Sequence, residues 1–314
     1  MNKKEPLVSV IMNCLNGEKY LKEAIDSVYA QTYKNWEIIF WDNCSTDKTA
    51  QIAKSYNKKL RYFKGEKTVI IAAARNKALA QTNGEFIAFL DCDDLWLPEK
   101  LEKQILLFYN DAKTAIVTSN AICFNQKGNC SLFCRSKPKI GYVFRELLSN
   151  YYICLSSAII RRSVLDDIGE WFDPRFSYVE DGDLFLRITY KWYLDYVDEP
   201  LAKYRIHNLN LICTRPDLPP KETEMMIDKF ISLYPSFETN YKQELIKIRY
   251  YVQYYFALID WQHRENSLVR KRLRPFLFIY PRALVPFVVS IFPYSCYKIF
   301  LRFFNKYIRH ITMS

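Results

Sequence analysis

An apolar run at residues 86–90 ends in three carboxylates, Asp91, Asp93 and Asp94. Such a run is typical of a strand buried inside the sheet of an α/β domain. Carboxylates at the end of a buried strand are costly to desolvate unless a positive group meets them. A divalent cation that binds oxygen ligands and phosphate would be one such group. The alternative is an ordinary polar turn before a helix that opens near Pro98.

Predicted strands and helices alternate through the N-terminal part of the chain, which indicates a parallel sheet in an α/β fold. Ligands of such sheets bind beyond the carboxyl ends of the strands. We therefore expect Asp42, which follows a predicted strand, to lie at the same edge as the acidic run. The strands are predicted at 8–12, 36–41, around Phe63 and at 86–90, and the helices at 21–28, from Thr49 and at 69–81.

The order and spacing of these segments resemble a family 2 glycosyltransferase with the GT-A fold. The resemblance covers roughly residues 6–210 and implies a Rossmann-like, mostly parallel sheet. It also implies inverting transfer of a sugar from a UDP-sugar. The matching segments are 8–11, Asn16, 27–33, 37–39, 42–47, 74–76 and 84–94, followed by 178–187 around Glu180-Asp181 and by 204–207 with His207.

The resemblance assigns four polar residues to the nucleotide-sugar donor. Asp42 would accept the imide hydrogen of uracil, and Arg75 would lie alongside the base or the diphosphate. Asp91 would meet the ribose hydroxyls, and Asn16 would belong to the same site.

The same resemblance implies a metal site and a general base. Asp93 and a neutral His207 would hold Mn²⁺ or Mg²⁺ against the two phosphates, because a cation lowers the cost of charge on the leaving UDP. Asp181 would take the proton of the acceptor hydroxyl. Glu180 and Asp183 are rivals for that role, and their alternative role is to complement the dipole of a helix that opens there.

Three positions depart from the family pattern. Asn13 stands where a proline is usual, and Cys44 stands where a glycine is frequent. Leu15 replaces an aromatic residue that often stacks on uracil. We therefore expect the base to pack on aliphatic surface and the donor to bind with modest affinity.

Basic residues are concentrated at the C-terminus. Residues 261–314 hold ten Lys or Arg and one acid, Glu265, which gives about +9 of the formal charge of +11. The longest uncharged piece has fifteen residues, 283–297, and contains Pro286 and Pro293, so it is short for a spanning helix. Basic and apolar residues interleaved in this way fit an element that lies on an anionic bilayer. Burial against the catalytic domain is the main alternative, and the apolar content disfavours nucleic-acid binding.

The sequence predicts three parts: a GT-A catalytic domain at 1–215, a helical extension at 216–267 and a membrane-associated tail at 268–314. The extension carries apolar residues at helical spacing at positions 245, 248, 252, 255 and 259.

Nine cysteines lack regular pairing or zinc spacing, which favours reduced thiols in the cytosol. The N-terminus does not read as a signal peptide. We expect a peripheral or monotopic protein on the cytoplasmic face of a bacterial inner membrane.

The predicted function is metal-dependent transfer of a hexose or N-acetylhexosamine to a hydroxyl of a membrane-linked glycan. Such acceptors include polyprenyl-linked oligosaccharides, lipopolysaccharide and capsule precursors. A sugar-1-phosphate nucleotidyltransferase is one alternative, but it needs a Gly-rich basic loop that residues 13–19 do not supply. A catalytically silent scaffold that binds nucleotide-sugar or membrane is another, and the intact carboxylates argue against it.

Overall fold

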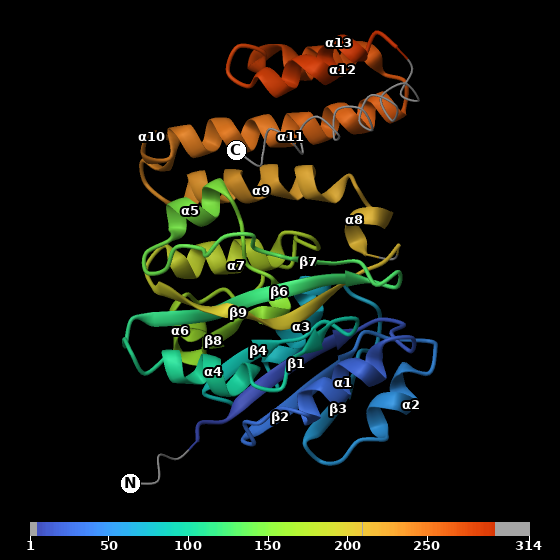
Figure 1. Cartoon of the computed structure of the whole chain (residues 1–314), viewed down its shortest axis with the longest axis vertical. Helices are drawn as coiled ribbons and strands as arrows, with labels where there is room; N and C mark the ends of the chain where they lie inside the picture. The colour runs from blue at the N-terminus through green and yellow to red at the C-terminus, as the bar shows by residue number, and fades with distance from the viewer. Residues whose placement is uncertain (1–4, 209, 293–314) are drawn as a thin grey trace. The chain divides into compact units, whose positions relative to one another are not determined.

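The computed structural model describes residues 5–208 and 210–292, and the chain forms two compact units, residues 1–210 and 211–314 (Figure 1). Unit 1 contains a nine-stranded sheet with the order β3-β2-β1-β4-β8-β6-β9-β5, and β7 pairs with β6. Unit 2 is helical in its described part.

The N-terminal strands of unit 1 form a parallel sheet, as the sequence predicts. β1 lies between β2 and β4 and pairs in parallel with both, and β3 pairs in parallel with β2. The carboxyl ends of β1, β2 and β4 therefore lie at one edge. The elements are β1 (Val8–Cys14), α1 (Leu21–Tyr29), β2 (Trp36–Asp42), α2 (Thr49–Lys54), β3 (Leu60–Lys64), α3 (Ile71–Leu79) and β4 (Phe86–Phe89).

The whole sheet is mixed, with six of its nine strands in one direction, so the prediction of a mostly parallel sheet is confirmed only in part. β8 runs antiparallel to both β4 and β6, and β9 runs parallel to β6 but antiparallel to β5. A buried strand reads as the same apolar run in either direction, so its sequence does not reveal its orientation. These strands are β5 (Leu95–Trp96), β6 (Thr114–Asn125), β7 (Cys130–Leu132), β8 (Ile159–Arg161) and β9 (Tyr193–Ile206).

Helical segments complete unit 1 and bury their apolar faces. Leu21, Ala24, Ile25 and Val28 of α1 are buried in the core, and so are the apolar residues of α7. Residues 155–157 form the 3₁₀ turn η1, which leads into β8. The remaining helices are α4 (Lys100–Leu107), α5 (Phe144–Ser149), α6 (Arg162–Asp167) and α7 (Glu180–Thr189).

Unit 2 has a small core in which Trp261 and Leu273 are fully buried. Leu245 and Val252 of α11 are buried as their spacing predicts, whereas Tyr255 is 47% exposed. No helix in the described part of the chain is long and apolar enough to cross a bilayer. Residues 293–314 of the predicted tail lie outside the described residues. The elements are α8 (Leu211–Thr214), α9 (Leu218–Leu233), α10 (Phe237–Asn240), α11 (Lys242–Gln262), α12 (Asn266–Leu273), η2 (Arg274–Phe276), η3 (Pro281–Ala283) and α13 (Leu284–Val289).

Candidate active site

Hydrogen bonds join the loop after β1 to the loop after β2 at the carboxyl edge of the parallel strands. The side-chain oxygen of Asn16 accepts from the backbone N–H of Thr46 at 2.9 Å, and the backbone N–H of Asn16 donates to Ser45 Oγ at 2.9 Å. Asn16 has φ of 55°, in the left-handed region, where Asn is enriched among non-glycine residues. Asn16 thus holds together the two loops that flank the predicted donor site.

Asp42 ends β2 and is fully buried. Its carboxylate accepts from Tyr62 Oη at 2.6 Å and from the backbone N–H of Ser45 at 2.7 Å. An ionised carboxylate offers about four lone-pair positions, so Asp42 retains capacity for a further donor. Cys44 has φ of 71°, a conformation that glycine adopts without strain. The departure from the family glycine therefore preserves a glycine-like backbone.

Arg75 of α3 lies between two carboxylates. Its Nη2 donates to Asp91 Oδ1 at 2.8 Å, and its Nη1 donates to Glu180 Oε1. The side chains of Arg75 and Glu180 are 3% and 6% exposed, whereas that of Asp91 is 36% exposed. Burial raises the pKa of Glu180, and the positive charge of Arg75 opposes that rise. Arg75 thereby connects the end of β4 to the first residue of α7.

His207 follows the end of β9 and faces the acidic run. Its Nε2 lies 2.8 Å from Asp93 Oδ2. Arg205, two residues earlier, donates through Nε to the backbone carbonyl of Asp93 at 2.7 Å and through Nη2 to Glu23 Oε2 at 2.8 Å. Burial and the charge of Asp91 raise the pKa of Asp93, while His207 lowers it. The end of β9 therefore fixes the loop that carries Asp93.

Asp94 is buried, unlike the two carboxylates that precede it. It is 1% exposed and accepts from Ser156 Oγ at 2.6 Å and from the backbone N–H of Arg205 at 2.9 Å. Burial raises the pKa of Asp94 well above its usual range, and the charges of Asp93 and Asp91 raise it further. Asp94 is thus a buried acceptor that ties the acidic loop to η1 and β9.

Asp181, the second residue of α7, is half-buried. Tyr151 Oη donates to its Oδ2 at 3.0 Å, and the backbone N–H of Gly182 donates to its Oδ1 at 2.8 Å. Burial raises the pKa of Asp181, while Arg75 and the Tyr151 hydrogen bond lower it. A partly accessible carboxylate with a raised pKa is chemically suited to accept a proton near neutral pH.

A second acidic group lies at the loop before α7 and along that helix. Among the residues that the structure describes, Glu170, Asp173 and Asp183 offer carboxylate oxygens within 4.8 Å of one another. Arg187 pairs with Asp183 at 2.8 Å, and Arg175 pairs with Asp173 at 2.6 Å. Because two guanidinium groups already offset this negative charge, the group is a network of ion pairs that anchors α7.

A family model for glycosyl transferase family 2 matches residues 9–169, just over half of the 314 residues. The chain belongs to this family. The match spans β1 to β8 and includes the acidic run and both loops described above. A member of this family is a glycosyltransferase, which confirms the predicted enzyme class.

Individual relatives support the same assignment. An uncharacterized glycosyltransferase of Rickettsia typhi is 33% identical over 280 residues, which are 86% of this chain and 83% of the relative. The Escherichia coli UDP-Glc:alpha-D-GlcNAc-diphosphoundecaprenol beta-1,3-glucosyltransferase is 33% identical over 183 residues, 58% of this chain and 69% of the relative. The crystal structure of S. aureus TarS 1–349 in complex with UDP-GlcNAc has a TM-score of 0.59 at 19% identity and covers 90% of this chain and 88% of that one. The likeness to TarS supports the GT-A type of α/β fold.

The structure places the predicted site residues at one edge of the family 2 domain, in three linked groups. Asn16 and Asp42 share contacts with Ser45, Arg75 joins Asp91 to α7, and Asp93 contacts His207. Asp181 adjoins the Arg75 partner Glu180. The sequence did not predict the contacts of three residues that build this site: Asp94 to Ser156, Tyr151 to Asp181, and Arg205 to the backbone of Asp93. The position of Arg205, two residues before His207, could have indicated its role in the site. Nothing in the sequence links Tyr151 to Asp181.

Proposed function

We propose that this glycosyltransferase moves a hexose or N-acetylhexosamine from a UDP-sugar to a hydroxyl of a membrane-linked glycan, with inversion at the anomeric carbon. The observation that carries the proposal is the Arg75 bridge, which joins Asp91 of the donor motif to the helix of the candidate base. The E. coli relative, whose name gives a UDP-Glc donor and a diphosphoundecaprenol-linked acceptor, supports both substrates.

Donor recognition is assigned to the edge formed by β1, β2 and β4. Asp42 would accept the imide hydrogen of uracil with its remaining lone pairs. Asp91, the most exposed carboxylate that contacts Arg75, would accept from the ribose hydroxyls. Leu15 is 48% exposed at this edge, which supports an aliphatic surface for the base.

The donor atoms of Asp93 and His207 fit Mn²⁺ or Mg²⁺. The Asp93 side chain is 31% exposed, so a cation can reach its oxygens, and carboxylate and imidazole are ligands that Mn²⁺ accepts. When bound, the cation would stabilise the negative charge on the leaving UDP. The two side chains contact each other at 2.8 Å, so their ligand atoms lie at one place.

Asp181 is assigned the role of general base. Inversion requires the acceptor oxygen to attack the anomeric carbon from the face opposite UDP while a carboxylate takes its proton. The bond to the UDP oxygen breaks as the new glycosidic bond forms, and the proton passes to Asp181 Oδ1 or Oδ2. Tyr151 orients this carboxylate. Glu180 is occupied by Arg75 and Asp183 by Arg187, which makes both rivals poorer acceptors.

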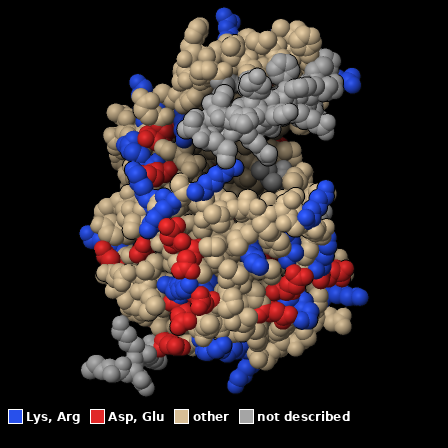
Figure 2. Space-filling view, viewed as in Figure 1, with Lys and Arg blue, Asp and Glu red and all other residues tan. Residues whose placement is uncertain are grey.

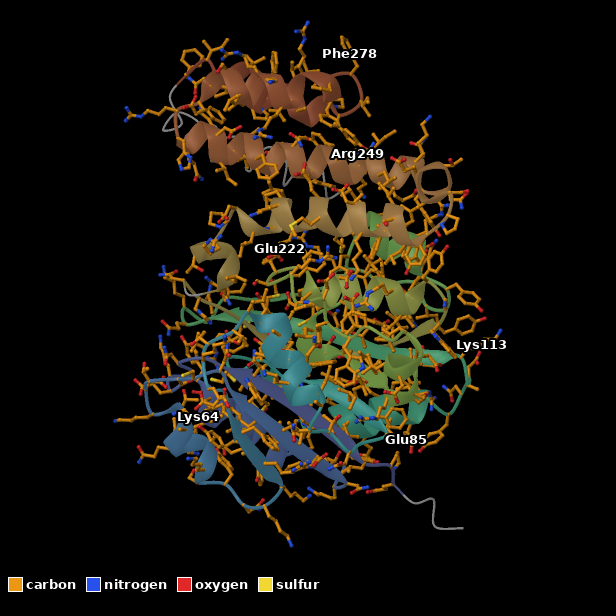
Figure 3. All side chains as sticks on the ribbon, turned by 180° about the vertical axis from the view of Figure 1, so that it is seen from behind. Lys64, Glu85, Lys113, Glu222, Arg249 and Phe278 are labelled. Atoms are coloured by element: carbon orange, nitrogen blue, oxygen red, sulfur yellow. The ribbon has the colours of Figure 1, made fainter. Side chains whose placement is uncertain are left out.

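Membrane association is assigned to unit 2. Phe278 is fully exposed and points away from the helices of the unit (Figure 3). Leu284 and Val288 are exposed one turn apart on α13, and Ile291 is exposed just after it. In the view of Figure 2, the described surface of α12 and α13 is largely uncharged, with isolated basic side chains. Exposed apolar residues beside basic ones fit an anionic bilayer surface, such as the inner face of a bacterial membrane.

Release of UDP tests the proposal. The protein is incubated with UDP-glucose, UDP-galactose and their N-acetyl counterparts, together with detergent-solubilised lipid-linked glycans. We expect one donor to give UDP release that depends on the acceptor and on Mn²⁺ or Mg²⁺, with a glycan product of inverted anomeric configuration. Donor binding without any release would favour the silent scaffold. Release that survives chelation by EDTA would contradict the metal mechanism.

A further inference from the structure

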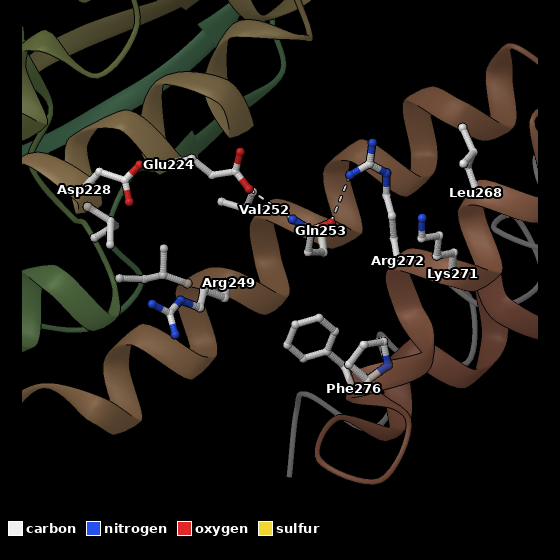
Figure 4. Close-up of a pocket in the computed structure, with 12 residues that line it drawn as sticks. Glu224, Asp228, Arg249, Val252, Gln253, Leu268, Lys271, Arg272 and Phe276 are labelled. Carbon is white, nitrogen blue, oxygen red and sulfur yellow. Dashed lines mark hydrogen bonds between the residues drawn. The ribbon is translucent and has the colours of Figure 1, made fainter. Parts of the chain in front are cut away.

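Unit 2 contains a cavity between α9, α11, α12 and η2 that the proposed reaction does not use (Figure 4). Its volume of about 660 Å³ lies inside the range of about 300–1,000 Å³ that is usual for small-molecule sites. All of its lining residues belong to the helical unit. The cavity is therefore a candidate site in its own right.

One side of the cavity is apolar. Val252 of α11 and Ile227 of α9 are buried, and Phe276 of η2 contributes an aromatic ring. Ile248, Leu268 and Pro275 complete this wall. An apolar wall of this size attracts a hydrocarbon chain, because burial yields about 25 cal/mol for each Å² removed from water.

The α12 side of the cavity is cationic. Arg272 donates through Nε to Asp260 Oδ2 at 2.6 Å and through Nη1 to Gln253 Oε1 at 3.0 Å. Among the described residues, no hydrogen-bond partner is found for its Nη2 beyond these contacts. Lys271, which also lines the cavity, forms no ion pair with the described residues. Asp260 offsets part of the charge of Arg272, which also stacks on Phe256, so Lys271 and the remaining Nη2 donor of Arg272 are the groups with capacity for an anion at this side.

The carboxylates of the cavity lie on another wall. Glu224 and Asp228 extend from α9, whereas Lys271 and Arg272 extend from α12 (Figure 4). Glu224 accepts from Gln253 Nε2 at 3.0 Å, and burial raises its pKa while the charge of Arg272 lowers it. The side-chain amide of Gln253 joins Glu224 to Arg272, whereas Lys271 is further from this hydrogen-bonded pair in the view of Figure 4 and forms no ion pair with the described residues.

We propose that this cavity binds the lipid end of the acceptor, with a prenyl chain on the apolar wall and its phosphate or diphosphate on Lys271 and Arg272. This inference rests on the proposed function, since a membrane-linked acceptor supplies such an end. An apolar wall beside cations matches an anionic amphiphile better than a free sugar, which offers neither a long apolar chain nor a charge. Arg249 also lines the cavity, and its exposed pair with Glu238 is weak enough to yield to a phosphate.

Calorimetry on the full-length protein with farnesyl diphosphate, kept below its micelle concentration, tests the inference. We expect one molecule to bind per chain, and farnesol and inorganic diphosphate each to bind at least tenfold more weakly. We expect this order because farnesol lacks the anionic group that the cations would bind, and inorganic diphosphate lacks the chain that the apolar wall would bind. Equal binding of farnesol would overturn the phosphate assignment, and equal binding of inorganic diphosphate would overturn the chain assignment. Absence of farnesyl diphosphate binding would overturn the inference as a whole.

Two variants locate the site. Lys271→Glu should weaken farnesyl diphosphate binding at least tenfold by replacing a cation with an anion. Leu268→Trp should weaken it similarly by filling the apolar side from a position that is 39% exposed and therefore outside the packed core. Lys221→Glu on α9 makes the same charge change away from the lining residues and should leave binding unchanged. If Lys221→Glu weakens farnesyl diphosphate binding as much as Lys271→Glu does, the weakening comes from the change in net charge and the ligand binds elsewhere.

Different results would contradict the lipid site and the proposed transferase function. The Lys271→Glu variant should keep wild-type UDP binding, and its KM for a lipid-linked acceptor should rise while its activity on a short soluble glycan stays unchanged. Transfer to lipid-linked acceptor with an unaltered KM would overturn the lipid site and leave the transferase function intact. Farnesyl diphosphate binding in a protein that releases no UDP with any donor would instead contradict the proposed function.

Discussion

His207 Nε2 lies 2.8 Å from Asp93 Oδ2, although 114 positions separate the two residues in the chain. The pairing of β9 with β6 and β5 brings His207 to the end of the acidic loop, and Arg205 fixes the Asp93 backbone from the same strand. Both side chains are less than one-third exposed, at 13% for His207 and 31% for Asp93. The fold therefore brings together the oxygen and the nitrogen that we propose as ligands of the cation.

Asp93→Ala should abolish the effect of Mn²⁺ on UDP binding, because it removes the proposed carboxylate ligand of the cation. Calorimetry of UDP binding with and without Mn²⁺ measures this effect, and circular dichroism checks the fold. Asp167→Ala changes an exposed carboxylate of α6 and should bind UDP and Mn²⁺ like the wild type. An undiminished Mn²⁺ effect in Asp93→Ala would place the cation elsewhere.

Asp181→Asn should retain donor binding but lose turnover by about 10²–10⁴-fold, the usual contribution of a general base. The amide is nearly isosteric with the carboxylate and cannot accept the proton of the acceptor. Initial rates of UDP release measure the loss. A reduction of less than about tenfold would transfer the role to another carboxylate, for which Glu180 is the neighbouring candidate.

Tyr151→Phe should move the acid limb of the pH–rate profile to higher pH. The Tyr151 hydroxyl lowers the pKa of Asp181 by donating to its carboxylate, so its removal raises that pKa further. Activity needs the ionised base and falls as pH drops through this pKa. A hydrogen bond to a charged group contributes about 1.5–3 kcal/mol, which corresponds to about one pH unit or somewhat more. A loss of activity without a shift of the limb would assign Tyr151 to substrate contact instead.

Arg75→Met should lower the free energy of unfolding by about 3–5 kcal/mol, the usual cost of breaking a buried ion pair from one side. The cost arises because the Glu180 carboxylate, only 6% exposed, loses its cation. The double variant Arg75→Met with Glu180→Leu should recover part of this loss, since no charge is then left buried. Urea unfolding of both variants measures the difference. Equal stability of the single and double variants would show that the pair is not coupled in the folded state.

The sequence predicted the elements that local pattern determines and missed those that depend on distant contacts. The apolar spacing of Leu21, Ala24, Ile25 and Val28 identified α1 and its buried face correctly, and apolar runs identified β1, β2 and β4. The orientation of β8 could not be predicted, because its antiparallel pairing depends on partners far along the chain. The same limit explains why the contacts from Arg75 to Glu180 and from Tyr151 to Asp181 were not foreseen.

Phe278→Glu should weaken binding to anionic liposomes, because Phe278 is fully exposed on a basic and apolar part of unit 2. Binding of the wild type should rise with the fraction of acidic lipid and weaken with salt, since each Lys or Arg at the surface contributes about 1 kcal/mol and is screened within a Debye length. Apolar insertion is not screened, so a salt-resistant part should remain.

The comparison at high salt decides whether Phe278 inserts. Burial of one Phe side chain is worth about 1.5–3 kcal/mol, so Phe278→Glu should lower the salt-resistant binding by about tenfold or more in liposome sedimentation. Leu132→Glu makes the same kind of change at a residue of β7 that is 49% exposed, in unit 1, and should bind like the wild type. Equal high-salt binding of Phe278→Glu and wild type would show that this segment does not enter the bilayer. Membrane attachment would then rest on electrostatics alone.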